Sequence, residues 1–95
     1  MISLASKPRL ATKARLHYDR HAGRHMLLYP EKGLLLNDSA LAILRLCSGE
    51  LTVADIVARL LQRRGATPAE SLERDVLSFL NTLAQRALIR DQPQL

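Results

Sequence analysis

The apolar residues of this chain follow two different patterns, one on each side of residue 37. Before this position they form short runs separated by turn residues, and after it they recur every three or four positions. Short apolar runs are typical of strands, and a spacing of three and four is typical of helices. The sequence therefore predicts a small sheet followed by a group of helices.

Three short apolar runs predict an antiparallel three-stranded meander. The predicted strands are residues 14–18, 25–29 and 34–37, with turn residues in between that suit chain reversals. In the second and third strands successive residues are apolar, so apolar side chains point to both faces of the sheet. The helices can cover one face. The other is left for a partner, a second copy of the chain or the N-terminal arm.

Three amphipathic helices are predicted after the sheet, over residues 38–47, 52–64 and 67–86, with residues 87–89 as a short extension packed on them. Asp38 or Ser39 suits the start of the first helix, and Thr52 with Asp55 resembles a capping box at the start of the second. Thr67–Pro68 has the form of a helix start for the third. Gly49 and Gly65 suit the ends of the first two helices.

The length of 95 residues and the hydrophobic fraction of 47% fit one domain. We expect a flexible N-terminal arm over residues 1–12, a single domain over 13–90 and a frayed tail over 91–95. No apolar run reaches the roughly 20 residues that cross a bilayer, and none resembles a signal peptide. A cytoplasmic protein with no membrane contact is therefore expected.

The formal net charge of +5 is concentrated in the first third of the chain. Residues 1–33 contain seven basic and two acidic residues, whereas residues 34–95 contain seven of each. Long-range attraction for an anionic partner is therefore centred on the N-terminal third, although a solvated face explains the same charges.

The residues that could carry catalysis or bind a metal are few. Cys47 is the only cysteine, so neither an internal disulfide nor a cysteine metal cluster can form, and its place on an apolar helix face predicts a buried thiol. His17, His21 and His25 are four apart, but they flank a predicted turn around Gly23 and so do not share a helix face. No phosphate-binding loop or hydrolase motif occurs. We expect a protein that is not an enzyme and that has no metal or cofactor.

Two binding functions remain. A meander with three helices is compatible with a winged-helix DNA-binding protein. Its third helix would carry two arginines against three acidic residues, which suits phosphate contacts poorly, so nucleic acid is an unlikely partner. Alternatively, a third strand at a sheet edge could accept an extended peptide as an additional strand.

Several short motifs together resemble the PqqD family of pyrroloquinoline quinone (PQQ) biosynthesis, and the resemblance runs from about residue 8 to residue 89. The residues that carry it are Pro8, Arg15, Leu27-Leu28-Tyr29-Pro30-Glu31, Asn37, Ile43-Leu44, Leu46-Cys47-Ser48-Gly49, Thr52-Val53 with Ile56, and Asp75-Val76 with Phe79-Leu80. The LLYPE run followed by the turn and Thr-Val is the most specific part. Ser48-Gly49 stands where the family often has Asp-Gly, a mild departure confined to the turn.

The resemblance implies an α+β, winged-helix-like fold and a non-catalytic peptide chaperone, a recognition element for ribosomally made, modified peptides. Such proteins bind the leader of the precursor peptide PqqA along the third strand, in a cleft shared with the third helix, and deliver it to the radical S-adenosylmethionine enzyme PqqE, whose cofactors do the chemistry. Carried onto this chain, the peptide-binding residues would be Gly33, Leu34, Leu35, Leu36, Asn37, Leu72, Asp75, Val76 and Phe79. Arg15 would be a structural or partner contact, and a homodimer through the sheet stays open.

Overall fold

The computed structural model describes residues 1–30, 32–64 and 68–91, which form five strands and three helices. In chain order these are β1 (Pro8–Leu10), β2 (Arg15–Asp19), β3 (Arg24–Tyr29), β4 (Lys32–Leu35), α1 (Asp38–Arg45), α2 (Val53–Arg64), α3 (Ala69–Gln85) and β5 (Ile89–Asp91). The predicted α+β fold, a meander followed by three helices, is confirmed. A second sheet of two strands, β1 and β5, was not predicted.

The meander is the sheet β2-β3-β4, in which β3 is the central strand. The third strand begins and ends two residues earlier than predicted, at Lys32 and Leu35. Leu36 still donates its backbone N–H to the carbonyl of His25 at 3.0 Å. The side chain of Asn37, predicted to end the strand, accepts a hydrogen bond from the Ala40 N–H at 2.7 Å and caps α1. The predicted caps, Asp38 and Ser39, are therefore replaced by the residue before them.

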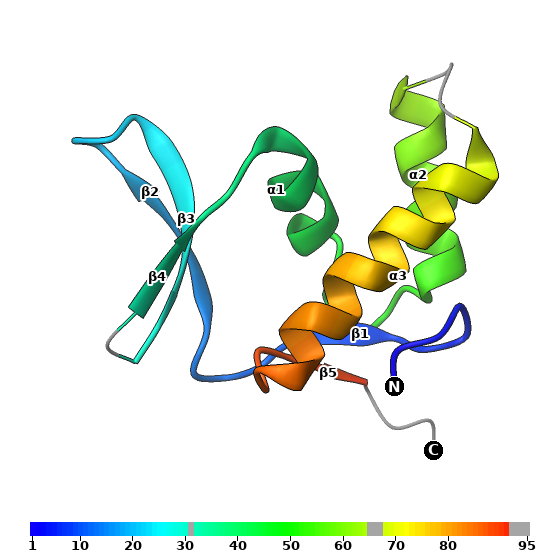
Figure 1. The fold of residues 1–95 in the computed structure, drawn as a ribbon, viewed down its shortest axis with the longest axis horizontal. Helices are drawn as coiled ribbons and strands as arrows, with labels where there is room; N and C mark the ends of the chain where they lie inside the picture. Colours follow the sequence, from blue (N-terminus) through cyan, green and yellow to red (C-terminus); the bar gives the residue numbers. More distant parts are fainter. Residues whose placement is uncertain (31, 65–67, 92–95) are drawn as a thin grey trace.

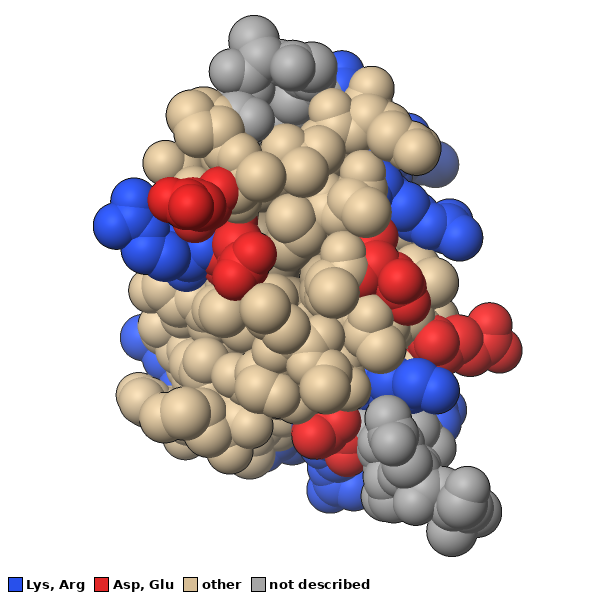
Figure 2. All heavy atoms as spheres, turned by 90° about the vertical axis from the view of Figure 1, so that its right-hand side faces the viewer, with Lys and Arg blue, Asp and Glu red and all other residues tan. Residues whose placement is uncertain are grey.

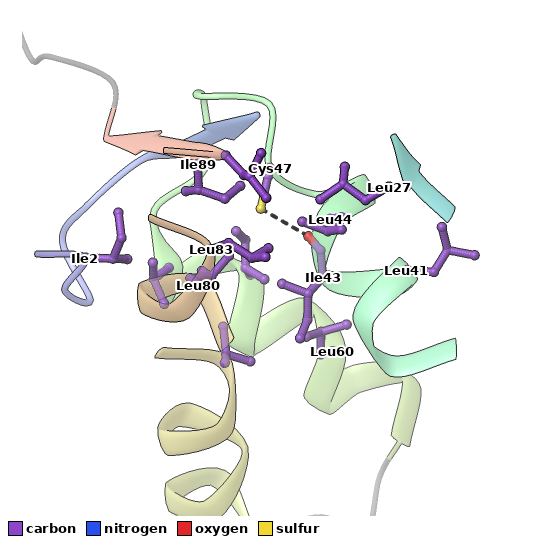
Figure 3. Packing of buried hydrophobic residues seen from close by; sticks show 14 of the residues in the cluster. Ile2, Leu27, Leu41, Ile43, Leu44, Cys47, Leu60, Leu80, Leu83 and Ile89 are labelled. Carbon is purple, nitrogen blue, oxygen red and sulfur yellow. Dashed lines mark hydrogen bonds between the residues drawn. The ribbon is translucent and has the colours of Figure 1, made fainter. Parts of the chain in front are cut away.

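One face of the meander packs on the helices. Leu27 is fully buried and Leu36 nearly so, and Leu16, Tyr29 and Leu34 are packed against the same core. In Figure 1, α1 lies between the sheet and the pair α2–α3. Figure 3 shows how Leu27, Leu44 of α1, and Leu80 and Leu83 of α3 belong to one cluster of buried side chains. This side of the sheet is called the inner face below.

The segment 1–12, for which we expected a flexible arm, is built into the fold. Ile2 is 5% exposed, and its N–H and carbonyl are bound by the side chain of Asn81 at 2.8 and 3.1 Å. The carbonyls of Leu4 and Ser6 accept hydrogen bonds from the first backbone N–H groups of α2. These N–H groups have no acceptor within a helix, so the segment satisfies them from outside. This partnership is between distant residues and leaves no periodic pattern in the sequence.

The strand β1 then continues the N-terminal segment and pairs antiparallel with β5, Leu10 opposite Ile89 and Pro8 opposite Asp91. The predicted extension 87–89 packs as expected, because Leu88 and Ile89 are 1% and 3% exposed. Of the predicted tail, Asp91 belongs to β5, and residues 92–95 lie outside the described residues.

The start of α2 agrees with the sequence. The capping box is present: Asp55 donates its N–H to the Thr52 hydroxyl and Thr52 donates its N–H to the Asp55 carboxylate, both at 3.1 Å. The Thr52 N–H, and after it the Thr52 hydroxyl, stabilise the ionised carboxylate and hold the pKa of Asp55 below its ordinary value. Pro68 precedes α3, and Gly65 and Thr67 lie outside the described residues. Within the described chain, every helix is too short or too polar to cross a bilayer.

Candidate functional site

The outer edge of β4 is the candidate site. Among the described strands β4 has one hydrogen-bonded neighbour, β3, so the opposite side of its backbone is unpaired. An edge strand of this kind presents a row of N–H and carbonyl groups that another strand can bind. The edge expected from the sequence is therefore present in the fold.

The register of β3 and β4 shows which groups of β4 face outward. Residues opposite each other are Leu27 and Leu34, Leu28 and Gly33, and Met26 and Leu35. In an antiparallel pair, every second residue directs both backbone groups toward its neighbour strand. Because Leu36 donates to the carbonyl of His25 on β3, this alternation places the backbone groups of Leu34 toward β3 as well. The N–H and carbonyl of Gly33 and Leu35 consequently point away from the sheet.

The side chains of β4 alternate in the same way between the two faces. Leu34 is half-buried and Leu36 is 5% exposed, and both lie on the inner face. Leu35 lies on the opposite face and is 51% exposed. The site therefore offers two outward-facing backbone positions and one exposed apolar side chain, while Gly33 adds no side chain to hinder an approaching backbone.

The helix side of the expected cleft is only partly available at the surface. Leu72 and Val76 are 5% and 0% exposed and lie in the core, so in this conformation they present no surface to a peptide. Phe79 is half-buried and packed against the core, and Asp75 is exposed. The principal neighbours of α3 are α2 and β5. Of the predicted peptide-binding residues, five therefore pack in or against one core: Leu34, Leu36, Leu72, Val76 and Phe79. The other four are exposed: Gly33, Leu35, Asn37 and Asp75.

In the described part of the chain, the other chemically reactive groups do not form a second site. Cys47 is buried, and its thiol donates to the carbonyl of Ile43 at 3.3 Å (Figure 3). Burial raises the pKa of this thiol to about 12, so it is protonated at neutral pH, as a buried apolar residue should be. His25 contacts the ring of Tyr18 edge-on, with ring centres 4.9 Å apart. No group of three metal-ligating side chains occurs among the described residues.

The charges around α2 and α3 also bear on the DNA-binding alternative. Figure 2 shows the face on the right-hand side of Figure 1, where basic and acidic side chains surround a centre of uncharged residues. Binding to a phosphate backbone requires a continuous basic surface. On this face, within the described part of the chain, positive and negative groups are instead interspersed, which does not favour nucleic-acid binding.

Comparisons with known proteins complete the description of the site. The family model described as "Coenzyme PQQ synthesis protein D (PqqD)" matches residues 24–89, a range that includes β3, β4 and all three helices. A PqqA binding protein of Bradyrhizobium diazoefficiens is 33% identical over 90 residues, which are 95% of this chain and 86% of that protein. A PqqA binding protein of Pseudomonas aeruginosa is 42% identical over 78 residues, covering 82% of this chain and 83% of that one.

A longer relative contains the same domain. The bifunctional coenzyme PQQ synthesis protein C/D of Methylorubrum extorquens is 40% identical over 82 residues, or 86% of this chain, and the chain spans 22% of that protein.

Two solved structures share the fold. The solution structure of the PqqD truncation of Methylobacterium extorquens PqqCD, described as a functional and stand-alone recognition element for modified peptides, has a TM-score of 0.79 and 36% identity, with 95% of each chain covered. The crystal structure of PqqD from Xanthomonas campestris has a TM-score of 0.58 and 34% identity, with 95% of this chain and 99% of that one covered.

Proposed function

The chain belongs to the PqqD family, and from this premise we propose that it binds the precursor peptide PqqA and presents it to the radical S-adenosylmethionine enzyme PqqE in PQQ synthesis. Relatives that match most of this chain are named PqqA binding proteins, and the domain of similar fold from Methylobacterium extorquens is described as a peptide-recognition element. In this proposal the chain contributes binding, and the chemistry on the peptide belongs to the enzyme that receives it.

The observation that carries the proposal is the open edge of β4. An extended peptide that adds a strand there would bond to the outward N–H and carbonyl groups of Gly33 and Leu35. Two residues of one strand supply two donors and two acceptors, which contribute affinity without reading the sequence of the peptide. Leu35 would add an apolar contact beside these bonds.

The neighbouring residues would support the edge and extend it. Leu34 and Leu36 hold β4 on the core, and Asn37 caps α1 directly after the strand, so that the edge keeps its position. On α3, Phe79 and Asp75 are the predicted residues that retain exposed surface. A basic residue of the leader would suit the Asp75 carboxylate. Leu72 and Val76 act behind them, by holding α3 in the core.

A matched pair of substitutions tests the site. Leu35 and Tyr18 are 51% and 50% exposed, and they lie on β4 and β2, at opposite edges of the same sheet. Leu35→Asp should weaken PqqA binding by about 1–2 kcal/mol, roughly 5- to 30-fold in Kd, because an apolar contact of a half-exposed leucine is lost. Tyr18→Asp makes a comparable change at the other edge and should leave Kd unchanged.

Isothermal titration calorimetry of each variant with PqqA, beside circular dichroism, gives the result. Equal weakening by both substitutions would place the peptide elsewhere or show a general effect of the added charge. Loss of the folded dichroism signal in Leu35→Asp alone would assign Leu35 to the core. A parallel titration with random duplex DNA at physiological salt should show no binding, and salt-sensitive binding to DNA without binding to PqqA would overturn the proposed function.

A further inference from the structure

The meander has a second face, opposite the inner one, which we call the outer face. By the register of the three strands, the residues on it are Arg15, His17, Asp19, Arg24, Met26, Leu28, Gly33 and Leu35. In Figure 1 the sheet lies at the left-hand end of the molecule, with α1 on its right and no described element on its left. The outer face is thus the uncovered side of the sheet.

The centre of the outer face is apolar. Met26, Leu28 and Leu35 lie on adjacent strands, and none of them belongs to the group of residues packed on the core. Gly33 lies among them, and a Cβ atom at this position would come within 2.8 Å of the Met26 Cε and 3.2 Å of the Leu28 Cδ2. The Met26 and Leu28 side chains therefore fold over the glycine and form a continuous apolar surface. Methionine adapts readily to a partner of irregular shape.

One end of the outer face is strongly basic. A hollow of about 430 Å³ at this end is lined by Lys13, Arg15, Leu28, Tyr29, Pro30 and Lys32. By the register, Tyr29 and Lys32 belong to the set of the inner face, so the hollow lies at the end of the meander and is not confined to the outer face. Three of the six are cations, and no acidic residue lines the hollow among the described residues. At the other end Asp19 faces Arg24, but its carboxylate accepts hydrogen bonds from the N–H groups of the hairpin turn. The surface is therefore apolar in the middle and positive at the end that contains the hollow.

Of the three candidates for covering this face, the structure argues against the N-terminal arm and a second copy of the chain. The N-terminal arm is excluded, because residues 2–6 bind α2 and α3 and residues 8–10 pair with β5. A second copy of the chain is disfavoured, because among the described residues its outer face offers the basic end a single carboxylate, that of Asp19, which already accepts hydrogen bonds within the hairpin turn. The peptide strand, in turn, adds at the β4 edge and not on a face.

We propose that the outer face docks a separate protein whose contact surface has an apolar centre and acidic residues at the end that meets Lys13, Arg15 and Lys32. This inference rests on the proposed function, in which the separate protein is the enzyme that modifies the peptide. Leu35 belongs both to the outer face and to the strand that holds the peptide. A protein on the outer face is therefore placed directly beside a peptide on the β4 edge, and the two can be bound at once.

Charge reversal at the basic end tests the docking surface without touching the peptide edge. Lys13 and Arg15 are exposed and lie on or next to β2, the edge strand opposite β4. The double variant Lys13→Glu/Arg15→Glu should bind purified PqqE at least tenfold more weakly than the unchanged chain at low salt. The difference should decrease as salt screens the charges. Its calorimetric Kd for PqqA should stay within about twofold of the unchanged chain, since the β4 edge is not altered.

The matched control makes the same change in net charge elsewhere. Arg63 of α2 and Arg90 of β5 are exposed and lie outside the meander, so Arg63→Glu/Arg90→Glu should leave binding to both PqqE and PqqA unchanged. If both double variants weaken PqqE binding equally, the docking surface is refuted. It is refuted as well if neither variant weakens PqqE binding.

The remaining outcomes separate this inference from the proposed function. A chain that binds PqqA but not PqqE would refute the docking partner and leave peptide binding intact. A chain that binds neither would refute the proposed function itself. A dimer of the unchanged chain in light scattering that becomes more stable in Lys13→Glu/Arg15→Glu, together with unchanged PqqE binding, would assign the outer face to a second copy.

Discussion

Replacing Leu35 by proline would test the backbone of β4 directly, because proline has no N–H to donate. The Leu35 N–H points away from β3, so the sheet itself loses no hydrogen bond, and proline is tolerated at such positions of edge strands. The side chain is 51% exposed, so little core packing is lost. We therefore expect Leu35→Pro to fold, with a free energy of unfolding within about 1 kcal/mol of the unchanged chain.

The expected loss of affinity follows from the hydrogen bond that the peptide can no longer make. The peptide carbonyl opposite Leu35 would lie against the proline ring, shielded from water and without a donor. Leaving a buried acceptor unsatisfied costs about 1–3 kcal/mol, which corresponds to roughly 5- to 150-fold in Kd.

Leu36→Pro is the matched control one residue further on. The Leu36 N–H is bound to the His25 carbonyl, and its side chain is 5% exposed. This substitution should reduce the free energy of unfolding by about 2 kcal/mol or more, because a sheet bond and core packing are both lost. Urea unfolding and calorimetric titration with PqqA, run on both variants, separate the two effects. A folded Leu35→Pro variant with an unchanged Kd would refute strand addition at β4.

Two further predictions concern stability. Because burial raises the pKa of the Cys47 thiol to about 12, folding favours its protonated form, and this contribution is complete below the unfolded pKa of about 9 and is lost as pH rises toward 12. Between pH 9 and pH 12 the free energy of unfolding should therefore decrease by about 1.4 kcal/mol per pH unit more in the unchanged chain than in Cys47→Ala. Urea unfolding that gives the same pH dependence for both proteins would contradict this. Deleting residues 1–6 should destabilise the chain by at least about 2 kcal/mol, since buried Ile2 and the acceptors for α2 are lost. An unchanged urea midpoint would instead show that the N-terminal segment is dispensable.

The elements that could be predicted from the sequence are those with local causes. The meander and the three helices follow from apolar spacing, and the Thr52–Asp55 capping box involves two side chains three positions apart. The ends of elements were less predictable. Asn37 was assigned to a strand although it caps α1, because strand ends and helix caps favour overlapping residue types and only the packed chain shows where β4 stops.

Within the candidate site, the residues of β4 could be predicted and those of α3 only in part. The run Leu34–Leu36 is apolar throughout, and strand geometry alone sends alternate side chains to opposite faces. On α3, by contrast, Leu72, Val76 and Phe79 all have helical spacing on one apolar side of the helix. Which of them is buried depends on how α3 packs against α2 and β5, and the structure buries Leu72 and Val76 while leaving Phe79 partly exposed.

The sequence by itself determined the class of fold, the excess of positive charge in the N-terminal third and the buried nature of Cys47, since each depends on composition or on residues a few positions apart. Only the tertiary structure decided that the N-terminal segment binds the first N–H groups of α2, that β1 pairs with β5, and that Lys13, Arg15 and Lys32 gather around one hollow at the end of the meander. These arrangements join residues far apart in the chain. Their hydrogen bonds and charge contacts exist only after folding has brought those residues together, so no local pattern records them.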